Sequence, residues 1–328
     1  MKGIIGSLLI AVGTFASHAA TADAEYSNAV ERGADAALNI FVHDEQGMPV
    51  SGAAINYAYW FRDLKHSLSV TGITDRTGHY LATGKCTADV HITVSCEGYY
   101  STRIERYMTS FGAKPYVIDG RWQPYGAECP IMVRKIVNPI PLEYHHCCNL
   151  KMPVFNEWIG FDMAEESFLK PYGDGNVADF EVKFNWDGKV RNEYVGAKLQ
   201  VHFPDDRTGG YWFNKIKTSA CQNAMLADTN ASYAVDFEFF KRKEFGKWVS
   251  QSFPEDKTMV VRTRCKVNDK GEILESWYGQ ISLLRFAISW KGYATLEIDY
   301  LRNPTANDNN LEPDGKKNLW KAQRRMPR

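Results

Sequence analysis

The sequence predicts a mainly β protein in which an N-terminal β-sandwich is followed by a larger antiparallel β domain. Three observations predict it. Short segments of alternating polarity recur along the chain, turn residues separate them at regular spacing, and 328 residues exceed the usual size of one domain. Hydrophobic residues make up 44% and charged residues 24%, which is typical of globular proteins.

The first residues have the pattern of a secretory signal. Lys2 precedes an apolar stretch over residues 4–15, and small residues follow up to Ala24. We therefore expect a signal peptide over residues 1–22 and a secreted or periplasmic, soluble mature protein. The apolar stretch is shorter than the roughly 20 residues that span a bilayer, and no second stretch follows, so no membrane span is expected.

The strands expected in the N-terminal domain are separated by glycine turns. Residues 38–43 alternate, and residues 44–53 form a turn with Gly47, Pro49 and Gly52. A second turn covers residues 72–80, and Val90, Ile92 and Val94 then face one side of a strand. Short strands at this spacing are typical of a sandwich.

These turns resemble those of a known family. The order Asp44 to Gly47, Pro49-Val50-x-Gly52-Ala53, Thr74-Asp75-x-x-Gly78-x-Tyr80 and Gly98-Tyr99-Tyr100 resembles the carboxypeptidase regulatory-like domain, a transthyretin-like β-sandwich, over residues 36–110. The resemblance implies an accessory module without catalytic residues of its own. Residues 61–67 look like an insertion relative to the shortest form of that family.

Residues 111–129 are rich in glycine and proline, and we expect them to form a linker. Beyond the linker, a β-rich domain of unknown function is expected over 130–302, followed by a polar C-terminal tail over 303–328. Its expected strands are 131–137, 158–163, 180–186, 198–203, 233–240, 259–267, 273–277, 281–290 and 295–300. One helix is expected over 214–226, and the tail is expected to pack Leu311, Leu319 and Trp320 onto a sheet.

The overall charge excludes some partners. Lys plus Arg number 39 and Asp plus Glu number 39, so there is no net positive field to attract nucleic acid or an anionic membrane. No nucleotide-binding or cofactor motif is present, and no cofactor is expected.

The densest group of potential metal ligands is His145-His146-Cys147-Cys148. Imidazole and thiolate suit zinc or copper, but neighbours on a strand project to opposite faces, so at most two of the four could meet one ion without a bend. The alternative is a structural role, with the thiols in disulfides, which export would permit. Seven cysteines leave at least one unpaired, and Cys86 with Cys96, and Cys221 with Cys265, are possible pairs within each domain.

Aromatic residues make up 13% of the chain and cluster with polar neighbours. Trp122, Tyr125, Tyr211 and Trp212 are candidate ligand-binding residues, because exposed rings can stack on sugars or anchor an interface. The alternative is that these side chains fill the two cores.

These observations favour an exported noncatalytic binding or structural protein that contacts a surface glycan or another envelope protein. No Gly-x-Ser-x-Gly, His-Glu-x-x-His or Walker motif is present. The alternative is a secreted hydrolase with an accessory sandwich, which uses carboxylates or the His145–Cys148 group. The candidate carboxylates are Asp162, Glu165, Glu166, Asp205, Asp206, Glu238 and Asp299. The sequence leaves the question of catalysis open.

Overall fold

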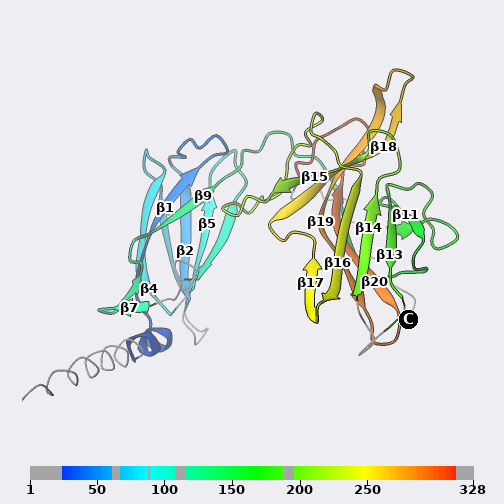
Figure 1. Cartoon of the computed structure of the whole chain (residues 1–328). Helices are drawn as coiled ribbons and strands as arrows, with labels where there is room; N and C mark the ends of the chain where they lie inside the picture. Colours follow the sequence, from blue (N-terminus) through cyan, green and yellow to red (C-terminus); the bar gives the residue numbers. More distant parts are fainter. Residues whose placement is uncertain are drawn as a thin grey trace, which may run out of the picture. The chain divides into compact units, whose positions relative to one another are not determined.

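The computed structural model describes residues 24–60, 67–87, 89–107, 116–187, 189 and 196–314. The expected signal peptide over 1–22, most of the expected insertion at 61–67, and Leu319 and Trp320 of the tail lie outside these residues. Twenty strands, many of them labelled in Figure 1, and one short helix over 24–32 make the described protein mainly β, which confirms the predicted fold class.

The chain divides into two compact units. The first contains residues up to Ile136 together with Ile216–Gln222, and the second contains Val137–Lys215 and the residues from Asn223 onward. None of the described helical segments is long and apolar enough to cross a bilayer.

The first unit is a sandwich of two sheets. One sheet has the order β4-β1-β8-β7, with β9 also paired to β1, and the other has the order β3-β2-β5-β6. Their bounds are β1 Ala34–His43, β2 Ala54–Trp60, β3 Ser67–Ile73, β4 His79–Cys86, β5 Asp89–Ser95, β6 Thr102–Tyr107, β7 Tyr116–Ile118, β8 Arg121–Gln123 and β9 Ala127–Met132. Fully buried residues from both sheets, among them Leu38, Ile55 and Ile92, form one core.

The turns that carry the family resemblance close through local hydrogen bonds. Asp44 Oδ1 accepts bonds from the backbone N–H groups of Gln46 and Met48. Asp75 Oδ1 accepts bonds in the same way from Thr77 and His79. An aspartate that satisfies the amides of its own turn explains why these short loops reverse the chain.

The structure corrects the expected linker. Residues 116–132 form β7, β8 and β9, and β9 pairs in parallel with β1. Asp119 and Gly120 both have positive φ and form the two-residue turn between β7 and β8. Glycine and proline in this stretch therefore mark tight turns inside the first sandwich. Of the strand expected over 131–137 as the start of the second domain, residues 131 and 132 end β9, and residues 133–137 lie outside the strands.

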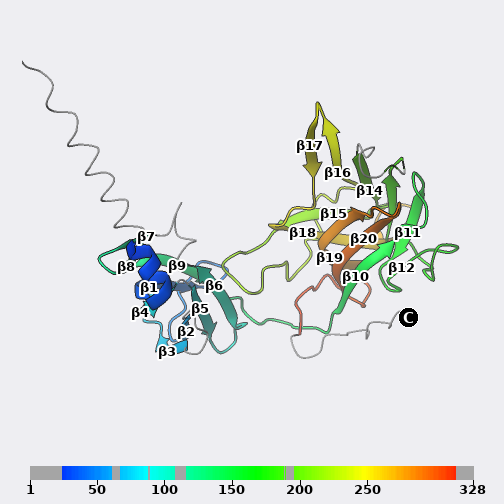
Figure 2. The same ribbon diagram turned by 90° about the horizontal axis from the view of Figure 1, so that it is seen from below.

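The second unit is a larger sandwich of two antiparallel sheets, ordered β10-β20-β19-β18-β15 and β12-β11-β13-β14-β16-β17. Figure 2 shows the two units from below. The strands of the second unit are β10 Glu143–Lys151, β11 Trp158–Asp162, β12 Ser167–Phe168, β13 Phe180–Asn185, β14 Gly196–His202, β15 Gly209–Asn214, β16 Asp236–Glu244, β17 Lys247–Gln251, β18 Lys257–Val267, β19 Ile273–Ile288 and β20 Ala294–Arg302.

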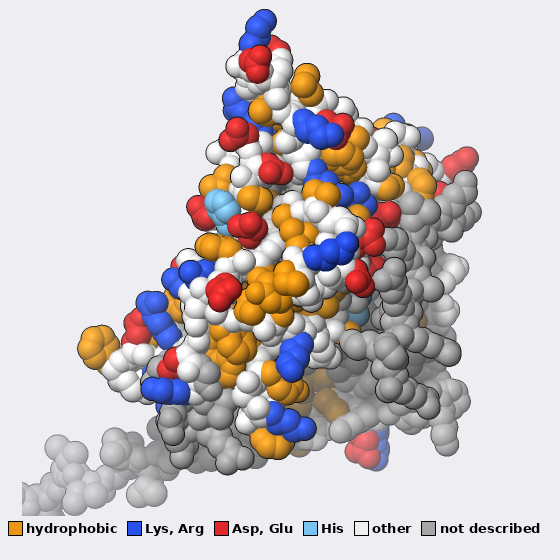
Figure 3. All heavy atoms as spheres, turned by 90° about the vertical axis from the view of Figure 1, so that its right-hand side faces the viewer, with side chains coloured by type: hydrophobic (Ala, Val, Ile, Leu, Met, Phe, Trp, Pro, Cys, Tyr) orange, Lys and Arg blue, Asp and Glu red, His pale blue; other side chains and the backbone are white. Residues whose placement is uncertain are grey.

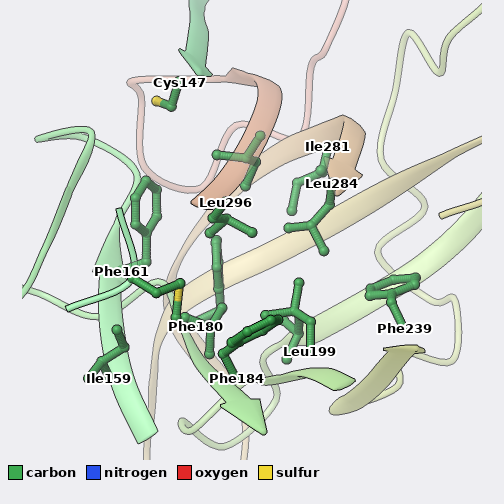
Figure 4. Close-up of a cluster of buried hydrophobic side chains, with 14 of the residues drawn as sticks. Cys147, Ile159, Phe161, Phe180, Phe184, Leu199, Phe239, Ile281, Leu284 and Leu296 are labelled. Carbon is green, nitrogen blue, oxygen red and sulfur yellow. The ribbon is translucent and has the colours of Figure 1, made fainter. Parts of the chain in front are cut away.

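Aromatic and aliphatic side chains from both sheets fill the second core. Phe161, Phe180 and Phe184 are fully buried, and Phe161 stacks on Phe180 with ring centroids 5.3 Å apart. Figure 4 shows Cys147 and Phe161 on one side of this cluster and Leu284 and Phe239 on the other.

The helix expected over 214–226 is absent. β15 runs to Asn214, and the following described residues form turns and bends, of which 216–222 belong to the first unit. Met132 N–H donates to Thr218 O, and Arg134 Nη1 donates to Cys221 O. Residues 216–222 therefore form hydrogen bonds with strand β9 and the residues after it. The spacing of apolar residues within the segment does not reveal such distant partners.

Candidate functional site

The His145–Cys148 group lies on β10 and is divided between the two faces of its sheet. The side chains of His145 and Cys147 are buried, whereas His146 is exposed and bonds Asp299 on the neighbouring strand at 2.5 Å. A register shift follows Cys147, and Asn149 has a positive φ of 58°. The alternation of β10 therefore separates the four potential ligands.

His145 occupies a buried polar cluster within the second sandwich. Its Nδ1 donates to Glu166 at 2.5 Å, and its ring stacks on Tyr300 with centroids 4.7 Å apart. Its Nε2 lies 3.8 Å from Glu143, whose carboxylate also binds Arg302 at 2.5 Å. The Tyr300 hydroxyl donates to Met163 O, and the carboxylates of Glu143 and Glu166 face the imidazole and the guanidinium. Within this part of the chain, His145 Nε2 and Arg302 Nε are buried without a hydrogen-bond partner.

The chemistry of this cluster does not favour a metal. Burial, with a smaller contribution from the Glu166 carboxylate, raises the pKa of Cys147 to about 12, whereas a metal ligand is a thiolate. The guanidinium of Arg302 binds the Glu143 carboxylate, so a positive charge already lies close to the imidazole of His145. Among the described residues, no three His, Cys, Asp or Glu side chains are placed to hold an ion. Metal binding by His145, His146, Cys147 and Cys148 stays a prediction that this arrangement does not support.

The suggested disulfides are not formed in this structure. Cys96, Cys147, Cys148 and Cys265 are free thiols, which removes the pairs of Cys86 with Cys96 and Cys221 with Cys265.

Two of the carboxylates named for a hydrolase, Asp162 and Asp299, are engaged in other contacts, and a third, Glu166, bonds His145. Asp162 is buried, accepts backbone N–H bonds from the 164–177 loop, and binds Arg264 at 2.6 Å. Asp179, also buried, binds the same guanidinium at 2.7 Å. Although burial opposes ionisation, the amide bonds and Arg264 lower the pKa of Asp162 on balance. Asp299 bonds His146 on the opposite face of β10 from Cys147. Asp162 therefore serves to hold its loop.

The four candidate aromatic residues do not form one site. Trp122 is fully buried in the first core, where its indole N–H donates to Cys86 O at 2.8 Å. Tyr125 is 44% exposed on the first unit, beneath the guanidinium of Arg121. Tyr211 and Trp212 are neighbours on β15 in the second unit and point to opposite faces. The prediction that Trp122 contacts a ligand is wrong, because its ring has no exposed surface.

Trp212 and Tyr211 contribute mainly to packing. Trp212 packs edge-on against Phe253 and Phe237, with centroids 5.0 Å and 5.7 Å away. Tyr211 packs against Tyr233 on the other side of the sheet and accepts a bond from the Asp228 N–H. Both side chains are half-buried.

A groove opens between the two sheets of the second sandwich, where β16 and β17 face β19. Its cavity is about 220 Å³. Its apolar lining consists of Phe239, Phe240, Phe253, Leu284 and Phe286. Lys241, Ser250, Gln251, Ser252 and Arg285 supply polar groups at the same site. An apolar floor with a few polar groups around it is the usual composition of a small-molecule site.

The elements explain why this groove exists. β17 is the edge strand of its sheet, and all five of its residues are exposed. Phe239 and Phe253 are still buried in the core, but the β16–β17 hairpin continues to Phe245, which is fully exposed. The hairpin therefore extends past the core, and the groove forms where the strand pair leaves it.

Sequence reasoning missed this groove. Its two sides come from residues 239–241 and 250–253 on one sheet and 284–286 on the other. The only local signal was the run of basic and aromatic residues from Phe239 to Trp248, which a whole-chain charge of zero concealed.

No protein-family model and no curated protein matches the sequence. Among solved structures, 3-chlorocatechol 1,2-dioxygenase from Rhodococcus opacus 1CP is 14% identical with a TM-score of 0.26, over 32% of this chain and 61% of that one. The chain thus spans about six tenths of the dioxygenase. A streptococcal ancillary pilin is 11% identical with a TM-score of 0.22, over 64% and 60%. The shaft pilin SpaA from Lactobacillus rhamnosus GG is 10% identical with a TM-score of 0.22, over 72% and 89%. Similarity at this level carries no functional argument.

Proposed function

We propose that this chain is an exported noncatalytic binding protein that holds a surface glycan in the groove of its second sandwich. The observation that carries the proposal is the composition of the groove, in which half-buried Phe240 and Phe286 lie beside Ser250 and Gln251. Aromatic rings contact the apolar faces of sugars, and hydroxyl and amide groups bond their hydroxyls.

The N-terminal unit has a supporting role in this proposal. Its turns resemble those of the carboxypeptidase regulatory-like domain, which implies an accessory transthyretin-like module, and its two sheets enclose a single core. The signal pattern at residues 1–22 is the basis for proposing release to the periplasm or the exterior.

The groove favours binding over glycoside hydrolysis. Hydrolysis needs two carboxylates about 5 to 9.5 Å apart across the bond that is cleaved. The described residues that line the groove are aromatic, aliphatic, hydroxyl, amide and basic.

A glycan array followed by calorimetry with the best ligand tests the proposal. Phe240→Ala and Phe286→Ala should each weaken binding at least tenfold, because each removes a ring from the groove. Tyr125→Ala is the matched control, since that ring is exposed on the first unit and should not affect binding. Binding that depends on Tyr125, binding only to a protein partner, or turnover of a polysaccharide would overturn it.

A further inference from the structure

Two hairpins of the second unit end at the same end of the sandwich. Phe184, next to the last residue of β13, packs on Phe286 near the end of β19 at 5.1 Å. The groove joins the same part of β19 to the β16–β17 hairpin. Figure 1 shows the β16–β17 turn and the β19–β20 turn pointing toward the lower end of this unit.

Phe245 lies at the tip of the β16–β17 hairpin, in a backbone conformation that is unusual for a bulky residue. Phe245 and Gly246 form a two-residue turn with φ of 48° and 79°. The equivalent turn between β7 and β8 has Asp119 and Gly120, the residue types that this geometry prefers. A bulky residue at positive φ is a steric outlier. Phe245 is nevertheless fully exposed, so packing within the chain does not compensate for its strain.

Two tryptophans accompany Phe245 at this end. Trp248 on β17 is 46% exposed, and Trp290 in the β19–β20 turn is 65% exposed. The ammonium groups of Lys241 and Lys243 lie 5.3 Å and 5.2 Å from the Trp248 ring. Lys291 lies 5.3 Å from the ring of Trp290. The exposed rings are therefore surrounded by lysine side chains.

The charge of these tips is strongly positive although the whole chain is neutral. Residues 240–251 and 286–293 carry the cations Lys241, Arg242, Lys243, Lys247 and Lys291. Their one carboxylate, Glu244, is paired with Arg242 at 2.6 Å. In Figure 3, hydrophobic and basic side chains lie toward the lower end of the visible face, with acidic side chains among them.

We infer that this end of the second sandwich docks on an anionic lipid bilayer. Phe245 and the two tryptophans enter the interface, and the lysines and Arg242 face the lipid headgroups. Tryptophan favours the headgroup level, and basic residues near an anionic leaflet attract it. A protein partner of standard size would need a continuous packed patch of about 800 Å² with few charges at its centre. Separate protruding rings among cations fit a bilayer surface better.

Flotation of the full-length chain with vesicles tests this inference. Vesicles with 30% phosphatidylglycerol in phosphatidylcholine should bind the protein, and pure phosphatidylcholine should bind it at least tenfold less. Raising NaCl from 50 to 500 mM should reduce the binding, because salt screens exposed charges.

Phe245→Asn separates docking from folding. Asparagine prefers this turn, so the melting temperature should stay the same or rise, whereas vesicle affinity should fall at least tenfold through loss of the inserted ring. Ile73→Asn is the matched control, since Ile73 is 67% exposed on the first unit, and it should leave binding unchanged. Lys243→Glu with Lys247→Glu should abolish the preference for anionic lipid, whereas Lys85→Glu with Lys135→Glu on the first unit should not.

Equal binding to both vesicle types, no vesicle binding, or unchanged affinity of the Phe245→Asn variant would overturn the inference. Binding to soluble polyglutamate but not to anionic vesicles would assign the basic tips to an acidic protein partner instead. Because this test uses vesicles without glycan, its failure leaves the groove proposal intact.

Discussion

Cys147 shows how one residue's environment decides its chemistry. Its thiol lies beside Tyr300 and the Glu166 carboxylate, and burial is the main reason that its pKa rises to about 12. At pH 8 such a thiol remains protonated and unreactive. A cysteine in a ligand-like motif therefore acts here as a small core residue.

Cys147 should resist alkylation in the folded protein. With iodoacetamide at pH 8, we expect half-exposed Cys148 and Cys96 to be labelled much faster than Cys147, as measured by peptide mass spectrometry. In urea the three should react at similar rates. Labelling of Cys147 as fast as its neighbour Cys148 would contradict the buried, protonated thiol.

Substitution of Asp179 tests the buried ion cluster that Asp162, Asp179 and Arg264 form. The Asp179 carboxylate binds Arg264 and accepts bonds from Thr263 Oγ1 and the Met163 N–H. Asp179→Asn should lower the free energy of unfolding by about 3 kcal/mol, because it weakens one partner of a buried ion pair. Glu275→Gln, which breaks the exposed pair with Lys266, should cost less than about 1 kcal/mol by the same urea titration. Equal costs would show that the buried cluster contributes no more than a surface pair.

At the scale of elements, residues 116–132 show most clearly where sequence patterns mislead. Glycine and proline in this stretch suggested a linker, whereas Asp119-Gly120 is a hairpin turn and β9 lies beside β1. The parallel partner of β9 is about ninety residues earlier in the chain, as Leu38 pairs with Ala127. A local pattern contains no information about a partner so distant.

Trp122→Ala should therefore destabilise the first sandwich. We expect a loss of about 3 to 5 kcal/mol, because the mutation leaves a cavity and removes the bond to Cys86 O. Tyr125→Ala, three residues further on and 44% exposed, should change stability by less than about 1 kcal/mol in the same urea titration. A small effect of Trp122→Ala would restore it as a candidate surface residue.

Other strands were predictable for physical reasons that can be named. In β13, Phe180, Val182 and Phe184 alternate with half-buried polar residues, so the period of two is visible. β19 was expected as two strands, because Tyr278, Gly279, Gln280 and Ile281 are all buried and the alternation stops there. β10 was missed, because its inward residues His145 and Cys147 are buried through partners on other strands.

At the scale of the whole molecule, the mainly β class followed from composition, turn spacing and alternation, whereas the groove did not. Its sides come from two sheets and meet only in the folded second unit. The buried ion cluster likewise joins Asp162, Asp179 and Arg264, which are far apart in the sequence.

Stability of the whole chain should fall in acid. Amide bonds and Arg264 hold the pKa of Asp162 below its usual value, and His145 and Arg302 do the same for Glu143, although burial opposes both. A carboxyl whose pKa is lower when folded stabilises the protein above its unfolded pKa of about 4, and this contribution is lost as pH falls through the folded value. Melting temperature should therefore drop as the pH falls below about 4. Asp162→Asn should melt lower at pH 7 and show a shallower acid dependence, and a parallel curve would contradict this assignment.

The pairing of β1 with β9 also governs how the chain can mature. During synthesis, β1 and β4 emerge well before residues 127–132, so one side of β1 presents unpaired amides and carbonyls to its surroundings until β9 arrives. Closing a loop of that length is entropically costly and slow. The nascent chain therefore passes through a stage in which an apolar strand edge is uncovered, and escorting chaperones would protect it most at that stage.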